Sequence, residues 1–142
     1  VVEVSPGHLL GMARYEERPY VEGRTRCVLW QFRSDDDGVT WTEPQPTEIL
    51  GKPPHLLKLQ DGRILVTYGY RHAPFGQRAS LSDDGGATWD TDHEIILRAD
   101  APSADLGYPA TTQLEDGTLL TVYYQIEPPD EKTSLMLTRW RL

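Results

Sequence analysis

Two stretches of this sequence, 55 residues apart, decide its fold. They read Pro54-His-Leu-Leu-Lys-Leu-Gln-Asp-Gly-Arg-Ile-Leu-Val-Thr-Tyr68 and Pro109-Ala-Thr-Thr-Gln-Leu-Glu-Asp-Gly-Thr-Leu-Leu-Thr-Val-Tyr123. Proline, leucine, Asp-Gly, a second leucine and tyrosine recur in register, and Gly7 in an upstream, degenerate copy aligns with the two Asp-Gly glycines. Asp-Gly between strand-forming segments is typical of a β-hairpin with a type I′ turn, which needs positive φ at both central residues. We therefore predict a repeated hairpin, with turns at 61–62 and 116–117.

An eight-residue motif accompanies two of these hairpins. Residues 34–41 and 82–89 both fit Ser-x-Asp-x-Gly-x-Thr-Trp. The serine and aspartate side chains can bond backbone N–H groups across a turn, and the glycine permits a backbone conformation that a Cβ would oppose. We predict that Trp41 and Trp89 occupy equivalent, mostly buried positions between strands. A calcium loop is disfavoured, because Arg33 stands where the EF-hand pattern requires an acid five residues before Gly38.

The two motifs together define a repeating unit of four antiparallel strands in about 50 residues, which is typical of a β-propeller blade. We predict an all-β chain that forms a single partial β-propeller, with blades at approximately 1–48, 49–100 and 101–142. No stretch shows capped, helical periodicity, so no helix longer than two turns is expected within 54–90.

Composition excludes several classes of protein. The chain has 142 residues, 38% of them hydrophobic, and a net charge of −8, which is a globular composition. No apolar run approaches the ~20 residues of a membrane helix, and the acidic balance disfavours generic nucleic-acid binding. The absence of an initial Met suggests that upstream sequence is missing. No signal peptide is visible, so the compartment is left open. The lone Cys27 excludes an intrachain disulfide and is expected to be a buried thiol.

The eight-residue motif is the Asp-box, or BNR repeat, and with its flanking hairpins the chain resembles the bacterial sialidase (neuraminidase) superfamily over nearly its whole length. This resemblance implies a six-bladed propeller, of which the chain would be the C-terminal two and a half blades. It also implies an exo-α-sialidase, a retaining glycoside hydrolase whose partner is a sialylated glycan or another acidic sugar. Family members bind the sugar carboxylate with three arginines, and use a tyrosine nucleophile activated by a glutamate and an aspartate as general acid. We expect no cofactor and no metal.

Strand direction places the candidate site at one end of the sheets, opposite the Asp-Gly turns and Asp-boxes. The segments that reach this end are 14–26, 51–55, 69–78 and 105–109. The resemblance makes Arg14 one arginine of the triad; the alternative is a surface arginine paired with Glu16 or Glu17. The next triad arginine is Arg71 or Arg78, which the sequence does not separate, and the other would bind sugar hydroxyls or a local acid.

Tyr108, placed just before the first strand of its blade, matches the nucleophile of the family, although Pro109 stands where the family has serine. The alternative is a tyrosine packed on Pro109. A phenol suits an anionic sugar, because a carboxylate nucleophile would repel the substrate carboxylate. Family spacing puts the activating glutamate upstream of Val1 and not at Glu3. Near the same end, His55 contacts a sugar hydroxyl or packs within its loop.

Two classes of function stay open. The first is an exo-sialidase in which Arg14, Arg71 or Arg78, and Tyr108 converge on a space that one carboxylate could fill. The second is a non-catalytic Asp-box propeller that binds carbohydrate or protein, and a propeller hydrolase for another acidic sugar is a further alternative. In either case the chain by itself is expected to be inactive.

Overall fold

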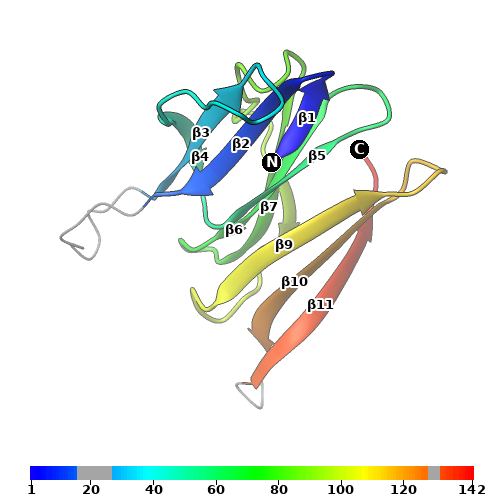
Figure 1. Cartoon of the computed structure of the whole chain (residues 1–142). Helices are drawn as coiled ribbons and strands as arrows, with labels where there is room; N and C mark the ends of the chain where they lie inside the picture. Colours follow the sequence, from blue (N-terminus) through cyan, green and yellow to red (C-terminus); the bar gives the residue numbers. More distant parts are fainter. Residues whose placement is uncertain (16–26, 128–131) are drawn as a thin grey trace.

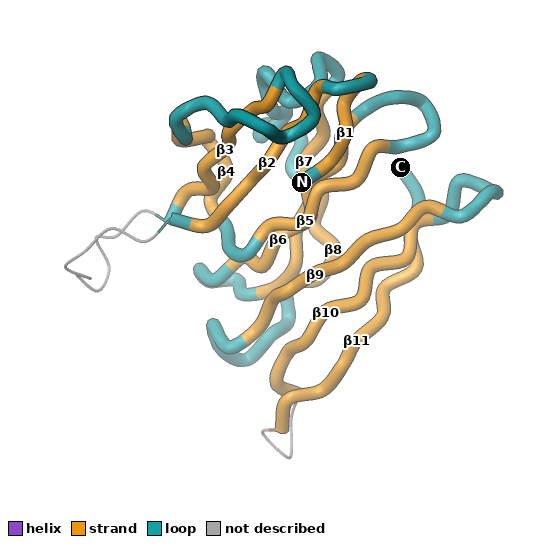
Figure 2. Tube along the Cα trace, in the orientation of Figure 1, coloured by secondary structure: helices purple, strands orange, loops and turns teal. Residues whose placement is uncertain are grey.

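The chain is all-β in the computed structural model, which describes residues 1–15, 27–127 and 132–142. No helix occurs within these ranges. The strands form three antiparallel sheets of three or four strands that follow one another in chain order (Figure 1). This confirms the prediction of an all-β fragment made of four-stranded blades. The tube in Figure 2 shows the same arrangement, with loops gathered at the two ends of the strands.

Each sheet is a simple meander in which neighbours in sequence are neighbours in space. The first sheet contains β1 (Val2–Ser5), β2 (His8–Arg14), β3 (Val28–Ser34) and β4 (Gln45–Leu50). The middle sheet contains β5 (Pro54–Lys58), β6 (Ile64–Tyr70), β7 (Gly76–Ser82) and β8 (Ile95–Arg98). The third sheet contains β9 (Leu106–Gln113), β10 (Leu119–Glu127) and β11 (Lys132–Trp140). The first strands of the sheets lie side by side, β1 next to β5 and β5 next to β9 (Figure 1).

The repeated hairpins form as predicted, but the predicted type I′ turn is wrong. Gly62 and Gly117 have φ of 92° and 79°, whereas the preceding aspartates are not in the positive-φ region. In the first hairpin the Gly62 N–H donates to the Leu59 carbonyl (3.0 Å) and the Leu59 N–H donates to the Arg63 carbonyl (2.9 Å). These bonds define a three-residue loop, a type I turn followed by a left-handed glycine. The glycine supplies the positive φ alone, so the aspartate escapes the strain.

Both Asp-box loops form the internal hydrogen bonds that the motif predicts. In the second loop the Gly86 N–H donates to Ser82 Oγ (2.7 Å), and both the N–H and the hydroxyl of Thr88 donate to the Asp84 carboxylate. The first loop repeats these bonds with the residues of 34–41. Gly38 and Gly86 have φ of 87° and 86°. The Asp-box thus fixes the shape of a loop.

The core lies between the sheets. Between the first and middle sheets, buried apolar side chains form one cluster: Leu10, Leu29, Ile49, Leu56, Ile64, Val66 and Tyr68. Between the middle and third sheets, Leu59, Leu65, Ala79 and Leu119 form a second cluster. β6 carries buried residues on both faces because a sheet stands on each side of it. Cys27 is buried, as predicted.

The prediction of two equivalent, mostly buried tryptophans is wrong. Trp41 is 39% exposed, and its indole N–H donates to the Gly38 carbonyl of its own loop (3.0 Å). Trp89 is half-buried, packs against the first core cluster, and donates its indole N–H to Gln31 Oε1 on β3 (3.0 Å). Trp89 therefore contacts the neighbouring sheet, whereas Trp41 packs edge-on against Phe32 of β3 in its own sheet (ring centroids 5.1 Å apart).

Candidate functional site

Three segments meet at the end of the sheets where the sequence places the site. The Lys52 N–H donates to the Gly69 carbonyl (2.8 Å), which joins the entry of β5 to the end of β6. A Cβ added at Gly69 would lie 2.7 Å from the Lys52 carbonyl oxygen and 3.0 Å from Gly107 Cα. Segments 51–55, 69–78 and 105–109 therefore come together as predicted, and the missing side chain of Gly69 allows this close approach.

Tyr108 lies within β9, and the expectation that it precedes the strand is wrong. The β9–β10 register shifts between Val122 and Tyr124, so Tyr108 and Pro109 form a bulge opposite a single residue of β10. Tyr108 has φ of 51°, which is unusual for a bulky residue. Its side chain is 58% exposed, whereas Pro109 is buried. The bulge turns the tyrosine outward, and Tyr108 is not packed in the core between the sheets.

A second tyrosine lies beside Tyr108. The ring of Tyr124, on β10, is tilted against the Tyr108 ring with 5.9 Å between centroids. The Tyr124 hydroxyl donates to Asp105 Oδ1 (2.8 Å), and Arg71 Nη2 donates to the Tyr124 oxygen (3.5 Å). Burial and the bond to Asp105 raise the pKa of Tyr124. Two phenols, one guanidinium and one carboxylate thus gather in what we call the Tyr108 cluster: Arg71, Asp105, Tyr108 and Tyr124.

Arg71 brings unused hydrogen-bonding capacity to this cluster. Its Nη2 would lie 3.5 Å from a Cβ on Gly107, so the guanidinium reaches across to the start of β9. Its Nε is buried, and no residue in the described part of the chain accepts a hydrogen bond from it. A buried donor without an acceptor is costly. Arg78 Nε is also buried with no acceptor among the described residues, so this feature is shared by the two arginines.

Arg78 is engaged elsewhere. Its guanidinium forms an ion pair with Glu94, and its Cζ lies 3.3 Å from the centroid of the Tyr70 ring. The side chain is only 12% exposed. The Tyr68 hydroxyl also donates to Glu94. Burial is the main cause that raises the pKa of Tyr68, and the hydrogen bond to Glu94 is the next. Of the two arginines that the sequence left unresolved, Arg71 therefore contacts Tyr124, whose ring packs against Tyr108, and Arg78 pairs with a local acid.

Arg14 and His55 are not joined to the Tyr108 cluster by any contact between described residues. Arg14 is exposed at the end of β2, and its alternative partners Glu16 and Glu17 lie outside the described residues. His55, on β5, accepts a hydrogen bond at Nδ1 from the Thr111 N–H (3.3 Å), and burial lowers its pKa. His55 thus packs between β5 and β9 and not within a loop, and its contact with a sugar hydroxyl stays a prediction.

Sequence reasoning missed Asp105 and Tyr124 as members of the site. The repeat could not reveal Tyr124, because the 55-residue offset aligns it with Gly69. Counting the hairpin register outward from Gly117 would have placed Tyr124 opposite Tyr108, one residue away from its observed partner Gly107, because the bulge shifts the register. Asp105 lies within the expected segment 105–109, but its partner Tyr124 is distant in the sequence, so no local motif indicated its role.

Comparison with known proteins adds a structural likeness and no function. No family model matches the chain, and no curated protein matches it. A solved structure of a protein of unknown function from Dyadobacter fermentans DSM 18053 resembles it with a TM-score of 0.69 and 31% sequence identity. The match covers 97% of this chain and 40% of that one, so the chain spans less than half the length of this relative. Among the described residues, no helix is long and apolar enough to cross a membrane.

Proposed function

We propose that the chain is part of a six-bladed propeller glycosidase that removes a terminal acidic sugar, sialic acid, from glycans with retention of configuration. The observation that supports this most is the Tyr108 cluster, in which an exposed phenol on a strained bulge is linked through the Tyr124 ring to the Arg71 guanidinium. Backbone outliers of this kind concentrate at functional sites.

In this proposal Tyr108 is the nucleophile and Arg71 binds the carboxylate of the sugar. The Tyr108 oxygen attacks the anomeric carbon as its proton passes to a carboxylate base, and the bond to the leaving oxygen breaks as an acid protonates that oxygen. Water then displaces the tyrosine from the sugar with the same groups in reversed roles. The neutral phenol avoids the repulsion that an anionic nucleophile would meet.

Tyr124 and Asp105 support this geometry in the proposal. The bond from Tyr124 to Asp105 fixes the second ring, and that ring packs against Tyr108. Because Tyr124 also accepts from Arg71, one side chain links the nucleophile to the carboxylate-binding arginine. Arg14 is the second arginine that binds the sugar carboxylate in this proposal. Arg78 has a supporting role in the proposal, because its guanidinium is paired with Glu94.

The test is a pair of variants in the protein as its gene encodes it. Tyr108→Phe should lower turnover of 4-methylumbelliferyl sialoside at least about 100-fold while sialic-acid binding, measured by calorimetry, changes little. Arg71→Lys should instead weaken binding, because a lysine cannot form a bidentate bond to a carboxylate. Arg63→Lys is the matched control, since Arg63 pairs with Asp61 at the opposite end of the sheet.

The non-catalytic reading predicts a different outcome. If the wild-type protein binds sialic acid and turns over no aryl sialoside, the chain belongs to a carbohydrate-binding propeller. If the Phe variant retains normal turnover, the assignment of Tyr108 as nucleophile is wrong. Turnover of an aryl glucuronide in place of the sialoside would identify a hydrolase for another acidic sugar.

A further inference from the structure

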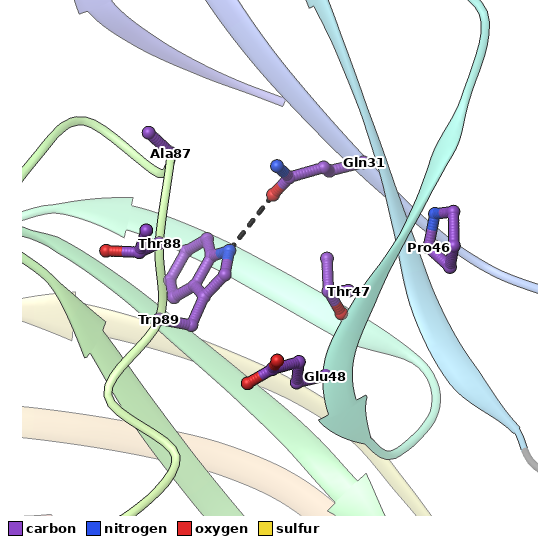
Figure 3. Close-up of a pocket in the computed structure, with 7 residues that line it drawn as sticks. All are labelled: Gln31, Pro46, Thr47, Glu48, Ala87, Thr88 and Trp89. Atoms are coloured by element: carbon purple, nitrogen blue, oxygen red, sulfur yellow. Dashed lines mark hydrogen bonds between the residues drawn. The ribbon is translucent and has the colours of Figure 1, made fainter.

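A hollow of about 220 Å³ lies between the first and middle sheets, at the second Asp-box (Figure 3). Its walls come from β3, β4 and the loop that follows β7. The residues that matter for its chemistry are Gln31, Thr47, Glu48, Thr88 and Trp89. All of them stand on strands or on the hydrogen-bonded Asp-box loop, so the hollow is held by rigid elements.

The indole of Trp89 is fixed in this hollow. Its N–H donates to Gln31 Oε1 across the two sheets, as the dashed line in Figure 3 shows (3.0 Å). The bond sets the orientation of the ring, which is half-buried and lines the hollow. An aromatic face that is already fixed loses little entropy when a ligand stacks on it.

Polar groups with unused capacity surround the ring. The Gln31 amide has given its oxygen to Trp89, which leaves its NH₂ as a free donor. Glu48 is exposed, and its carboxylate accepts no hydrogen bond within the part of the chain that the structure describes. Thr88 donates its hydroxyl proton to Asp84 (2.6 Å), and its oxygen points away from the Trp89 ring (Figure 3). One amide donor, from Gln31, and one carboxylate acceptor, from Glu48, therefore line the hollow together with the Trp89 ring.

From this arrangement we propose that the hollow binds a single neutral pyranose. A sugar ring offers an apolar face for Trp89 and hydroxyls that donate to Glu48 and accept from Gln31. The volume is below that of sites for drug-sized ligands, which suits one ring. A cationic ligand would leave the Gln31 donor unused, and an anionic sugar would be repelled by Glu48. The site is separate from the Tyr108 cluster, so the inference does not depend on the proposed glycosidase activity.

The test uses the indole N–H signals of the 4 tryptophans in a ¹⁵N-labelled chain. Methyl β-glucopyranoside, methyl β-galactopyranoside and methyl α-mannopyranoside are titrated to about 50 mM, and at least one should move the Trp89 signal saturably with a Kd on the order of 1 mM. The Trp41 signal, whose N–H is bonded within its own loop, should not move. The glucuronide matched to the glucoside differs only by its carboxylate and should bind at least about tenfold more weakly.

Two variants of surface glutamates complete the test. Glu48→Ala should weaken the sugar that binds best at least about tenfold, and Glu43→Ala, outside the hollow, should leave its Kd unchanged. The proposal is overturned if none of the three neutral sugars moves the Trp89 signal, or if the Glu48 variant binds as the wild type does. Where the glucoside binds, a glucuronide that binds as tightly also overturns the proposal.

Discussion

The two Asp-box loops have the same internal hydrogen bonds, but they differ in how their tryptophans contact the rest of the molecule. In each, the glycine N–H donates to the serine oxygen, and the threonine donates twice to the aspartate. The tryptophans that end the two motifs have different partners: Trp41 donates to its own loop, and Trp89 donates to Gln31 of the neighbouring sheet. The eight residues therefore encode the loop, whereas the surroundings of the tryptophan are decided by the adjacent sheet.

The largest expected difference between the two loops is in the cost of removing each tryptophan. Trp89→Ala should lower the free energy of unfolding by about 2–3 kcal/mol, less than for a fully buried tryptophan because Trp89 is half-buried. Trp41→Ala should cost less than about 1 kcal/mol, since Trp41 is 39% exposed. Urea denaturation of both variants measures the difference. Equal costs would show that the loops are equivalent after all.

A methyl group added to each loop glycine gives a second, smaller difference. A Cβ at Gly86 would lie 2.4 Å from Leu10 Cδ2 in the core, whereas a Cβ at Gly38 would lie 3.2 Å from Leu9 Cδ1. Both substitutions force alanine into positive φ, at about 1 kcal/mol. The clash with fully buried Leu10 should raise the cost of Gly86→Ala to about 2 kcal/mol, above that of Gly38→Ala. Thermal unfolding of the pair measures this, and the reverse order would contradict the packing described here.

The fold could be predicted from the sequence because its information is local and repeated. Asp-Gly between apolar runs defines the hairpins, and Ser-x-Asp-x-Gly-x-Thr-Trp defines the loops with bonds among eight neighbouring residues. The burial of Trp41 could not be predicted in this way, because it depends on a surface contributed by another part of the structure. The prediction of a type I′ turn was wrong for a related reason. In the three-residue loop a single glycine supplies the positive φ, and the sequence pattern does not reveal the length of the loop.

The candidate site could be predicted only in part. Strand direction correctly brought the segments around Gly69 and Gly107 together, because it follows from the hairpin order. The choice between Arg71 and Arg78 required side-chain positions, since Arg71 precedes β7 and Arg78 lies near its start. Arg78 forms an ion pair with Glu94, which lies in a separate loop, and no sequence motif links these two residues. The role of Tyr124 depends on a bulge whose position the repeat does not encode.

The bond that ties Trp89 to the first sheet gives a third prediction. Gln31→Leu removes the acceptor of the Trp89 indole and should lower the free energy of unfolding by about 1 kcal/mol, while the Trp41 indole signal stays in place. A double-mutant cycle with Trp89→Phe isolates the bond, because phenylalanine keeps much of the apolar surface and has no N–H. A coupling energy near zero would mean that the neighbouring sheet holds Trp89 by packing alone.

The smallest expected effect concerns pH and the Asp-box carboxylates. Hydrogen bonds from the side chain and backbone of Thr88 lower the pKa of Asp84 to about 2 from its ordinary value of 3.8. A carboxyl with a depressed pKa in the folded state stabilises the fold above its unfolded pKa, and this stabilisation is lost as pH falls through the folded pKa. Asp84 is exposed, so solvent screening reduces the contribution to less than about 1 kcal/mol. Asp84→Asn should therefore flatten the decline in stability between about pH 5 and pH 2, measured by urea denaturation at each pH.

Asp92→Asn is the control, because the Asp92 carboxylate accepts no side-chain hydrogen bond among the described residues. Asp36 has the same threonine bonds in the first loop, and its pKa is lowered for the same reason, so Asp36→Asn should flatten the curve in the same sense. A response from only one of the two aspartates would show that the neighbouring sheet influences the inside of the loop as well as its tryptophan.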